Sequence, residues 1–160
     1  MWYRLSKRQS KKIVFLDIDG VVNDFPNHDD KTINEIKKDF HKFLHEDKIN
    51  LLNKIVDEVN PDFVLSSYWR KHFSVKEVNK LFKDSGFKGS FIDKTSNHGE
   101  EHKDRWKQIK KSLEQHNPDK YVILDDGKVV DDKDHMVQTV KIKGLQEKDI
   151  DKAISLLKGK

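Results

Sequence analysis

A series of short apolar segments, each running directly into acidic or hydroxyl residues, limits most strongly how this chain can fold. Three segments fit this description: Ile13–Leu16, Phe63–Leu65 and Tyr121–Leu124. A weaker fourth segment covers Ser90–Ile92. Segments of this length, rich in β-branched and aromatic residues and bounded by turn residues, are typical of strands buried in a parallel sheet.

Helical patterns separate these predicted strands. Apolar residues recur every three or four positions within residues 33–44, 51–59, 75–82, 106–113 and 150–157. Ser74 and Glu77 form a capping-box sequence before the third pattern, and Gly86 is expected to end that helix. Strands that alternate with helices pair in parallel through right-handed crossovers. The sequence therefore predicts a three-layer, Rossmann-like α/β sandwich around a central parallel sheet.

Length and composition narrow the class of protein further. The 160 residues suit one domain, and they include no cysteine, which excludes disulfides and thiolate metal sites. No apolar run approaches the roughly 18 residues of a membrane span, so we expect no membrane partner and a cytoplasmic protein. The 32 lysines and arginines outnumber the 28 aspartates and glutamates, which is a weak indication of a polyanionic partner.

Acidic and hydroxyl side chains follow three of the predicted strands. In chain order these are Asp17 and Asp19, Ser66 and Ser67, and Asp125 and Asp126. The carboxyl ends of parallel strands meet at one edge of a sheet, so these side chains are expected to converge. Four carboxylates at one edge would repel one another unless a cation lay between them. Oxygen ligands without cysteine favour Mg²⁺ as that cation.

The spacing of Asp17 and Asp19 itself points to phosphate chemistry. Residues two apart on an extended chain point the same way, so both carboxylates can face one bound phosphate, while Gly20 lets the backbone turn away. One carboxylate can stay ionised and attack phosphorus. The other, more shielded, can hold a proton for the leaving oxygen.

In these motifs the chain resembles the haloacid dehalogenase (HAD) superfamily of phosphohydrolases. The segments DIDGVVN, VLSSYWR, YVILDDG and GLQEKDIDKAISLL resemble the small HAD domains of multi-domain Swiss Army knife RNA-repair proteins. The resemblance runs from about Lys11 to Leu157. It implies one HAD-like domain with a core over about residues 11–158 and a minimal cap, a small helical insertion over about residues 25–48.

The resemblance also implies roles for the residues at the first two strand ends. Asp17 corresponds to the nucleophile that forms an aspartyl-phosphate. Asp19 corresponds to the general acid/base, whose main-chain carbonyl also binds the metal. Ser66 corresponds to the hydroxyl that holds the phosphoryl group, with Ser67 as the alternative.

The resemblance further implies a metal site and a basic residue at a helix start. The implied ligands of Mg²⁺ are Asp17, Asp19, Asp125 and Asp126. Setting the sequence against the family pattern places Arg105 at the basic position. Because Trp106 stands where the family has glycine, Lys107 and Lys103 remain alternatives for this role.

Two further features permit more than one interpretation. The Trp69 indole could stack on a base while Arg70 binds a phosphate, as in single-strand binders, or Trp69 could pack in the core while Arg70 pairs with an acid. His98 and His102 are four residues apart, as in some zinc sites on helices. A polar loop beside the substrate is favoured there, because a glycine lies within the spacing.

Together these features predict a Mg²⁺-dependent phosphomonoester hydrolase that works through an aspartyl-phosphate. The resemblance to RNA-repair domains suggests a phosphate end of a nucleic acid or nucleotide as its substrate. A phosphatase of small metabolites or nucleotides is one alternative. Another alternative is a non-catalytic module that keeps the HAD fold to bind a phosphorylated partner. The sequence does not identify any protein partner.

Overall fold

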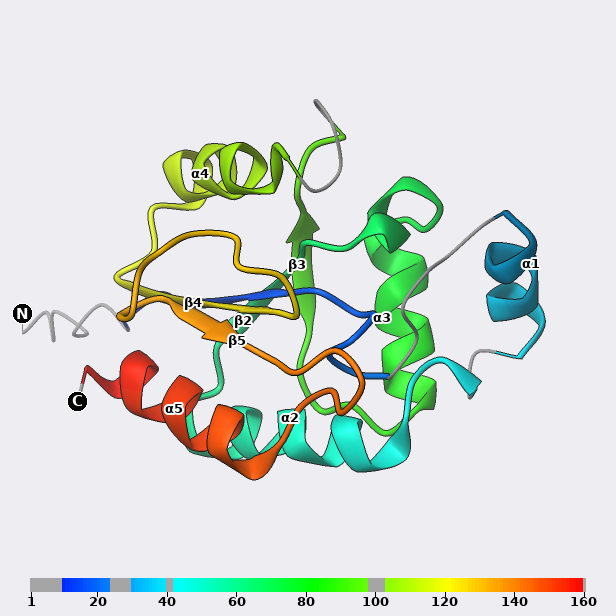
Figure 1. Cartoon of the computed structure of the whole chain (residues 1–160), viewed down its shortest axis with the longest axis horizontal. Helices are drawn as coiled ribbons and strands as arrows, with labels where there is room; N and C mark the ends of the chain where they lie inside the picture. Colours follow the sequence, from blue (N-terminus) through cyan, green and yellow to red (C-terminus); the bar gives the residue numbers. More distant parts are fainter. Residues whose placement is uncertain (1–9, 24–29, 40–41, 98–102, 160) are drawn as a thin grey trace, which may run out of the picture.

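Five parallel strands form the centre of the computed structural model, which describes residues 10–23, 30–39, 42–97 and 103–159. The strands are β1 (Lys12–Leu16), β2 (Asp62–Leu65), β3 (Phe91–Lys94), β4 (Lys120–Asp125) and β5 (Met136–Gln138). They lie in the order β3-β2-β1-β4-β5, so the first strand is central (Figure 1). The predicted parallel α/β sheet is confirmed. The fifth strand, β5, has only three residues, and the sequence pattern does not predict it.

Helices cover both faces of this sheet, which makes the three predicted layers. Helices α2 (Glu46–Val59), α3 (Val75–Asp84) and α5 (Glu147–Lys158) pack on one face, and α4 (Arg105–His116) packs on the other (Figure 1). A short helix, α1 (Asp30–Lys38), lies beyond the first strand, and a 3₁₀ turn, η2 (Tyr68–Lys71), follows β2.

The alternation of side chains along each strand separates two apolar cores. Val14 and Leu16 of β1 point towards α2, α3 and α5, whereas Ile13 and Phe15 point towards α4. Successive residues of a strand face opposite sides of the sheet, and strands buried on both sides are therefore apolar throughout. This double burial explains the continuous apolar segments in the sequence.

Sequence signals for helix ends are confirmed at α3. The Ser74 hydroxyl accepts a hydrogen bond from the Glu77 amide at 3.1 Å, and the Glu77 carboxylate accepts one from the Ser74 amide at 2.9 Å. By contrast, the predicted pattern over residues 33–44 is not one helix, since α1 ends at Lys38 and α2 begins at Glu46. No helix in the described parts of the chain is both long and apolar enough to cross a membrane.

A β-bulge in β3, a strand at one edge of the sheet, changes which of its side chains face α4. Phe91 pairs with Phe63, but the next pair is Asp93 with Val64, so Ile92 is an extra residue and is 40% exposed. A bulge of this kind reverses the side-chain alternation of the residues after it. Phe91, before the bulge, packs in the core on the α3 side. Asp93, after the bulge, faces α4 instead, where its Oδ2 lies 2.8 Å from His116 Nε2.

Candidate active site

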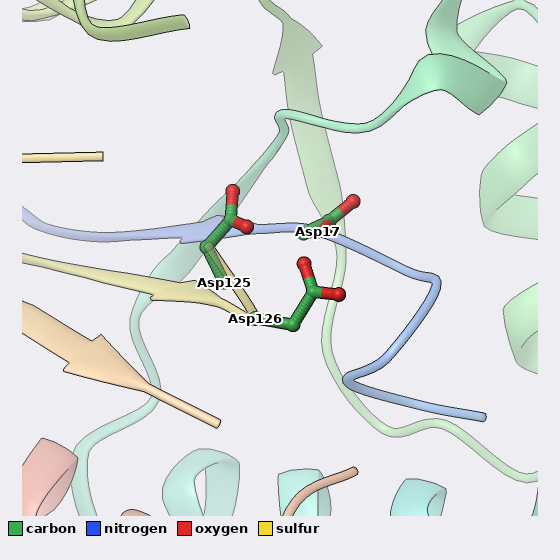
Figure 2. A group of neighbouring side chains, drawn as sticks. All are labelled: Asp17, Asp125 and Asp126. Carbon is green, nitrogen blue, oxygen red and sulfur yellow. The ribbon is translucent and has the colours of Figure 1, made fainter. Parts of the chain in front are cut away.

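Three carboxylates meet at the carboxyl edge of the sheet. Asp17 follows β1 directly, and Asp125 and Asp126 lie at the end of β4. Leu16 and Leu124 are partners in the parallel register, and the Asp17 amide donates to the Leu124 carbonyl at 2.9 Å. One ligand oxygen from each carboxylate lies within 4.8 Å of the other two (Figure 2). The predicted convergence of these acids is therefore present in the structure.

Arg105, the first residue of α4, extends over two of these carboxylates. Its Nη1 lies 2.8 Å from Asp125 Oδ2 and 3.4 Å from Asp17 Oδ2, and all three side chains are at most 8% exposed. The Lys107 side chain is 75% exposed and pairs with Asp104, and Lys103 is exposed as well. Of the three basic residues considered for this position, Arg105 is the one that the structure brings to the acids.

Burial and repulsion from neighbouring carboxylates raise the pKa values of Asp17 and Asp125. Burial raises the pKa of Asp17 well above its ordinary value, and the neighbouring Asp125 raises it further, while Arg105 opposes both effects. Burial also raises the pKa of Asp125, and Arg105 lowers it. A single guanidinium therefore compensates only part of the negative charge at this edge, which is the electrostatic setting that a bound cation stabilises.

The Asp19 carboxylate is held by two neutral donors. Asn23 Nδ2 donates to Asp19 Oδ1 at 2.9 Å, and the Trp69 indole N–H donates to Asp19 Oδ2 at 3.1 Å. The Asp19 side chain is half-buried and is not among the three carboxylates that cluster in the described part of the chain. This arrangement gives Asp19 a fixed orientation apart from the three clustered carboxylates, as expected of a residue that handles a proton.

The turn after β1 is fixed by contacts from the end of the chain. Gly20 has φ of 76°, and a Cβ there would lie 2.5 Å from Asp126 Oδ2, so glycine is required by both conformation and space. The Thr139 hydroxyl donates to the Gly20 carbonyl at 2.7 Å, and the Leu145 amide donates to the Val21 carbonyl at 2.8 Å. These bonds hold the segment that carries the first two aspartates.

Asn23 is a site residue to which sequence reasoning assigned no role. Its side chain is fully buried, and besides its bond to Asp19 it donates to the Phe43 carbonyl at 2.9 Å and accepts from the Gly20 amide at 3.2 Å. The only sequence signal is its place as the last letter of DIDGVVN. Its partner Phe43 lies 20 residues away, so the bond itself could not be predicted.

Replacing Asn23 with alanine should therefore affect both stability and activity. We expect a loss of about 1–3 kcal/mol in the free energy of unfolding, because buried polar groups lose their partners. We also expect a fall of about 10–100-fold in kcat, because Asn23 orients the Asp19 carboxylate and a small misplacement of a reacting group can cost that much. Denaturant unfolding and steady-state hydrolysis of a phosphate ester measure the two effects.

Asn53 offers a matched control for this variant. Asn53 is also buried, and both polar atoms of its side chain are hydrogen-bonded: Nδ2 donates to the Gly86 carbonyl and Oδ1 accepts from the Lys88 amide. It lies on α2 and touches none of the carboxylates named above. Asn53→Ala should lose comparable stability and keep its kcat. A similar fall of kcat in both variants would contradict an orienting role for Asn23.

The two serines after β2 have different environments. The Ser66 hydroxyl is buried and has no hydrogen-bond partner among the residues that the structure describes. The Ser67 hydroxyl accepts from the Trp69 amide at 3.2 Å and so caps the η2 turn. Of the two serines, Ser66 is thus the better placed to hold a phosphoryl oxygen, because no described residue occupies its hydroxyl.

The structure does not bring Trp69 and Arg70 to the surface as a base-stacking and phosphate-binding pair. Both side chains are fully buried. The indole packs against Phe73 with ring centroids 5.6 Å apart, as in the core alternative. The buried Arg70 guanidinium donates to the Ser67 and Ser96 carbonyls and to Gln108 Oε1. His98 and His102 lie outside the described residues, as do residues 24–29 and 40–41 of the predicted cap.

The comparison with known families decides which fold this site belongs to. Residues 13–150 match the family described as the HAD domain in Swiss Army Knife RNA repair proteins. The chain belongs to this family. Apart from Lys12, the match covers the five described strands, and it includes every residue of the site described above. No curated protein and no solved structure matches the chain. Family membership indicates a phosphatase of the HAD type.

Proposed function

We propose that this HAD domain is a Mg²⁺-dependent phosphomonoester hydrolase that works through an aspartyl-phosphate. One observation carries the proposal: carboxylates from two strand ends converge within 4.8 Å, with the buried Arg105 bridging two of them. Such a group is costly to bury as a purely structural feature. A metal ion and a phosphate bound there would offset this cost.

The residues at the strand ends fit Mg²⁺. Asp17, Asp125 and Asp126 offer three carboxylate oxygens, and Mg²⁺ prefers oxygen ligands and commonly takes one or two carboxylates together with substrate phosphate. We propose that these residues hold the ion, together with the main-chain carbonyl of Asp19. When bound, Mg²⁺ neutralises charge on the phosphoryl group and on the attacking carboxylate.

The chain's own residues supply the remaining steps. The Asp17 carboxylate attacks phosphorus, the phosphorus–oxygen ester bond breaks, and Asp19 transfers a proton to the leaving alkoxide. Ser66 and Arg105 bind the phosphoryl oxygens as charge develops on them. A water molecule that loses its proton to Asp19 then attacks phosphorus, which releases inorganic phosphate and restores the Asp17 carboxylate.

Hydrolysis of a chromogenic phosphate ester with and without Mg²⁺ tests this proposal. We expect turnover that requires Mg²⁺, that is lost in EDTA and that returns when the metal is added back. We also expect Mg²⁺ to stabilise the fold by about 2.7 kcal/mol at 100 times its dissociation constant. No turnover under either condition, in protein shown to be folded, would favour the non-catalytic phosphate-binding module instead.

For the substrate we propose a phosphate end of a nucleic acid or a nucleotide. The support is the family's occurrence in RNA repair proteins and the net charge of +4. Binding to a polynucleotide releases counterions, so activity on an end-phosphorylated oligonucleotide should fall steeply as salt is raised. Turnover of mononucleotides that does not respond to salt, with no activity on the oligonucleotide, would indicate the small-metabolite alternative.

A further inference from the structure

The indole of Trp69 forms a hydrogen bond between the segments that follow two neighbouring strands. Asp19 lies in the turn after β1, whereas Trp69 lies in the η2 turn after β2. Trp69 Nε1 donates to Asp19 Oδ2 at 3.1 Å, across 50 residues of sequence. Asn23, the other donor to this carboxylate, lies in the same turn as Asp19 and only four residues away. Of these two bonds, the one from Trp69 ties Asp19 to the strand end that carries Ser66.

Ser66 and Trp69 belong to one firmly held segment. The Ser66 amide donates to the Leu16 carbonyl of β1 at 2.8 Å, which fixes where the segment leaves the sheet. The Trp69 amide donates to the Ser67 hydroxyl at 3.2 Å, and the Arg70 amide donates to the Ser67 carbonyl at 3.0 Å. The indole N–H and the hydroxyl proposed to bind the phosphoryl group therefore keep a fixed separation.

The surroundings of the Trp69 ring hold it in place as well. The side chain is fully buried, and its ring lies against Phe73 with centroids 5.6 Å apart. The Lys94 ammonium donates to the Arg70 carbonyl at 2.9 Å and to the Phe73 carbonyl at 3.1 Å, so the end of η2 is also bound to β3. A donor that packing holds in one place orients the acceptor to which it binds.

The chemistry of the indole suits contact with an acid that gives up a proton. The indole N–H is neutral and only donates, so it neither supplies nor takes the transferred proton. As the ester bond to phosphorus breaks, its electron pair stays on the leaving oxygen, which takes the proton of the Asp19 carboxyl group. Asp19 then becomes a carboxylate, and a hydrogen bond to an ionised acceptor is roughly twice as strong as one between neutral groups. The bond from Trp69 to Asp19 therefore strengthens during the proton transfer.

We propose that Trp69 is the positioning residue for protonation of the leaving group. It fixes Asp19 relative to the phosphoryl site, so that the acid reaches the leaving oxygen, and it thereby determines which alcohols the enzyme releases. Leaving groups that form unstable alkoxides depend on Trp69, and those that form stable anions do not. This inference rests on the proposed function and deepens it, because it assigns one step of the reaction to a residue that touches no substrate.

Two esters with different leaving groups test the proposal. p-Nitrophenolate is a stable anion and leaves without a proton, whereas the ethoxide of ethyl phosphate must be protonated as it leaves. Trp69→Phe should lower kcat/KM for ethyl phosphate by about 10–100-fold, because a small misplacement of a reacting group costs that much. It should leave kcat/KM for p-nitrophenyl phosphate nearly unchanged. A ratio of the two values that stays at the wild-type level would overturn the proposal.

Phe82→Leu is the matched control for the loss of buried ring atoms. Phe82 is fully buried on α3, where it packs against Phe87 and Phe91 and touches none of the proposed catalytic residues. This variant should lose stability and keep the wild-type ratio of the two kcat/KM values. A change of the ratio as large as in Trp69→Phe would show that destabilisation alone produces the effect, and would overturn the proposal.

An isosteric replacement separates the hydrogen bond from the packing of the ring. Benzothienylalanine at position 69 carries sulfur in place of the indole N–H and keeps the shape of the ring. This variant therefore decides the question even if the cavity in Trp69→Phe prevents folding. We expect its ratio of kcat/KM values to change as much as predicted for Trp69→Phe. A wild-type ratio would mean that the indole acts through packing alone, which overturns the proposal.

Combination with Asp19→Ala tests whether Trp69 acts through Asp19. Residues that act as a unit have non-additive effects, so Trp69→Phe should lower kcat/KM for ethyl phosphate no further once the acid is absent. A further loss of similar size would overturn the proposal. Wild-type protein that hydrolyses neither ester overturns the proposed function and this inference together. Activity on both esters, with a constant ratio in the variants at position 69, overturns this inference alone.

Discussion

Asp17→Asn is expected to reduce kcat by at least about 1,000-fold, the scale of losing a catalytic nucleophile. The reason is that an amide cannot form the aspartyl-phosphate on which the proposed reaction depends. Hydrolysis of p-nitrophenyl phosphate in excess Mg²⁺ measures the effect. Asp57→Asn, which changes an exposed carboxylate paired with Lys88, is the control. Retained turnover in Asp17→Asn would disprove the nucleophile assignment.

The same substitution should stabilise the metal-free protein at neutral pH. The pKa of Asp17 is raised in the folded state, so this group favours folding below its unfolded pKa of about 3.8 and loses that contribution as pH rises through the folded value. Each unit of the difference is worth about 1.4 kcal/mol. In EDTA, wild-type protein should therefore lose more stability between pH 4 and pH 7.5 than Asp17→Asn does. Equal pH dependence of urea unfolding would contradict the buried, charged state of Asp17.

Arg105→Met is expected to cause the largest loss of stability among the variants considered. It leaves Asp17 and Asp125 buried without their shared cation, and removing one partner of a buried ion pair costs about 3–5 kcal/mol. Activity should fall as well, on the order of 100–1,000-fold, because a donor to the phosphoryl oxygens is lost. Denaturant unfolding in EDTA at pH 7.5 and steady-state kinetics in Mg²⁺ measure the two effects.

A second substitution separates electrostatics from packing at Arg105. In Arg105→Met with Asp125→Asn, one uncompensated charge is gone, so part of the lost stability should return, whereas a cost from packing alone would persist. Lys111→Met, an exposed change on the same helix, should shift stability by no more than about 0.5 kcal/mol. A larger loss of activity in Lys107→Met than in Arg105→Met would contradict the choice of Arg105.

Much of this arrangement could be predicted from the sequence because it depends on local patterns. Doubly buried strands must be apolar along their length, so β1, β2 and β4 are visible as continuous segments. The residues that follow them must meet at one edge, so the convergence of Asp17 with Asp125 follows from the parallel sheet. Arg105 could be proposed only from the resemblance to the family, whose pattern has a basic residue at the start of this helix.

Other features could not be predicted because they depend on partners far away in the chain. Nothing near Arg70 in the sequence shows that carbonyl groups of Ser67 and Ser96 and the amide of Gln108 would satisfy its guanidinium, and so allow full burial. Trp69 has two roles that sequence alone could not combine, since its ring packs in the core while its N–H reaches Asp19. β5 has only three residues, too few for a periodic signal.

The hydrogen bonds from Thr139 and Leu145 to the turn after β1 have a consequence for how the protein is made. Asp17 and Asp19 are synthesised early, but β4 and the residues that bond to the turn after β1 are synthesised more than 100 residues later. Pairings of such long sequence separation form slowly. We therefore expect a nascent chain that stops before Leu145 to lack the proposed Mg²⁺ site, so that binding of the metal would report that these late contacts have formed.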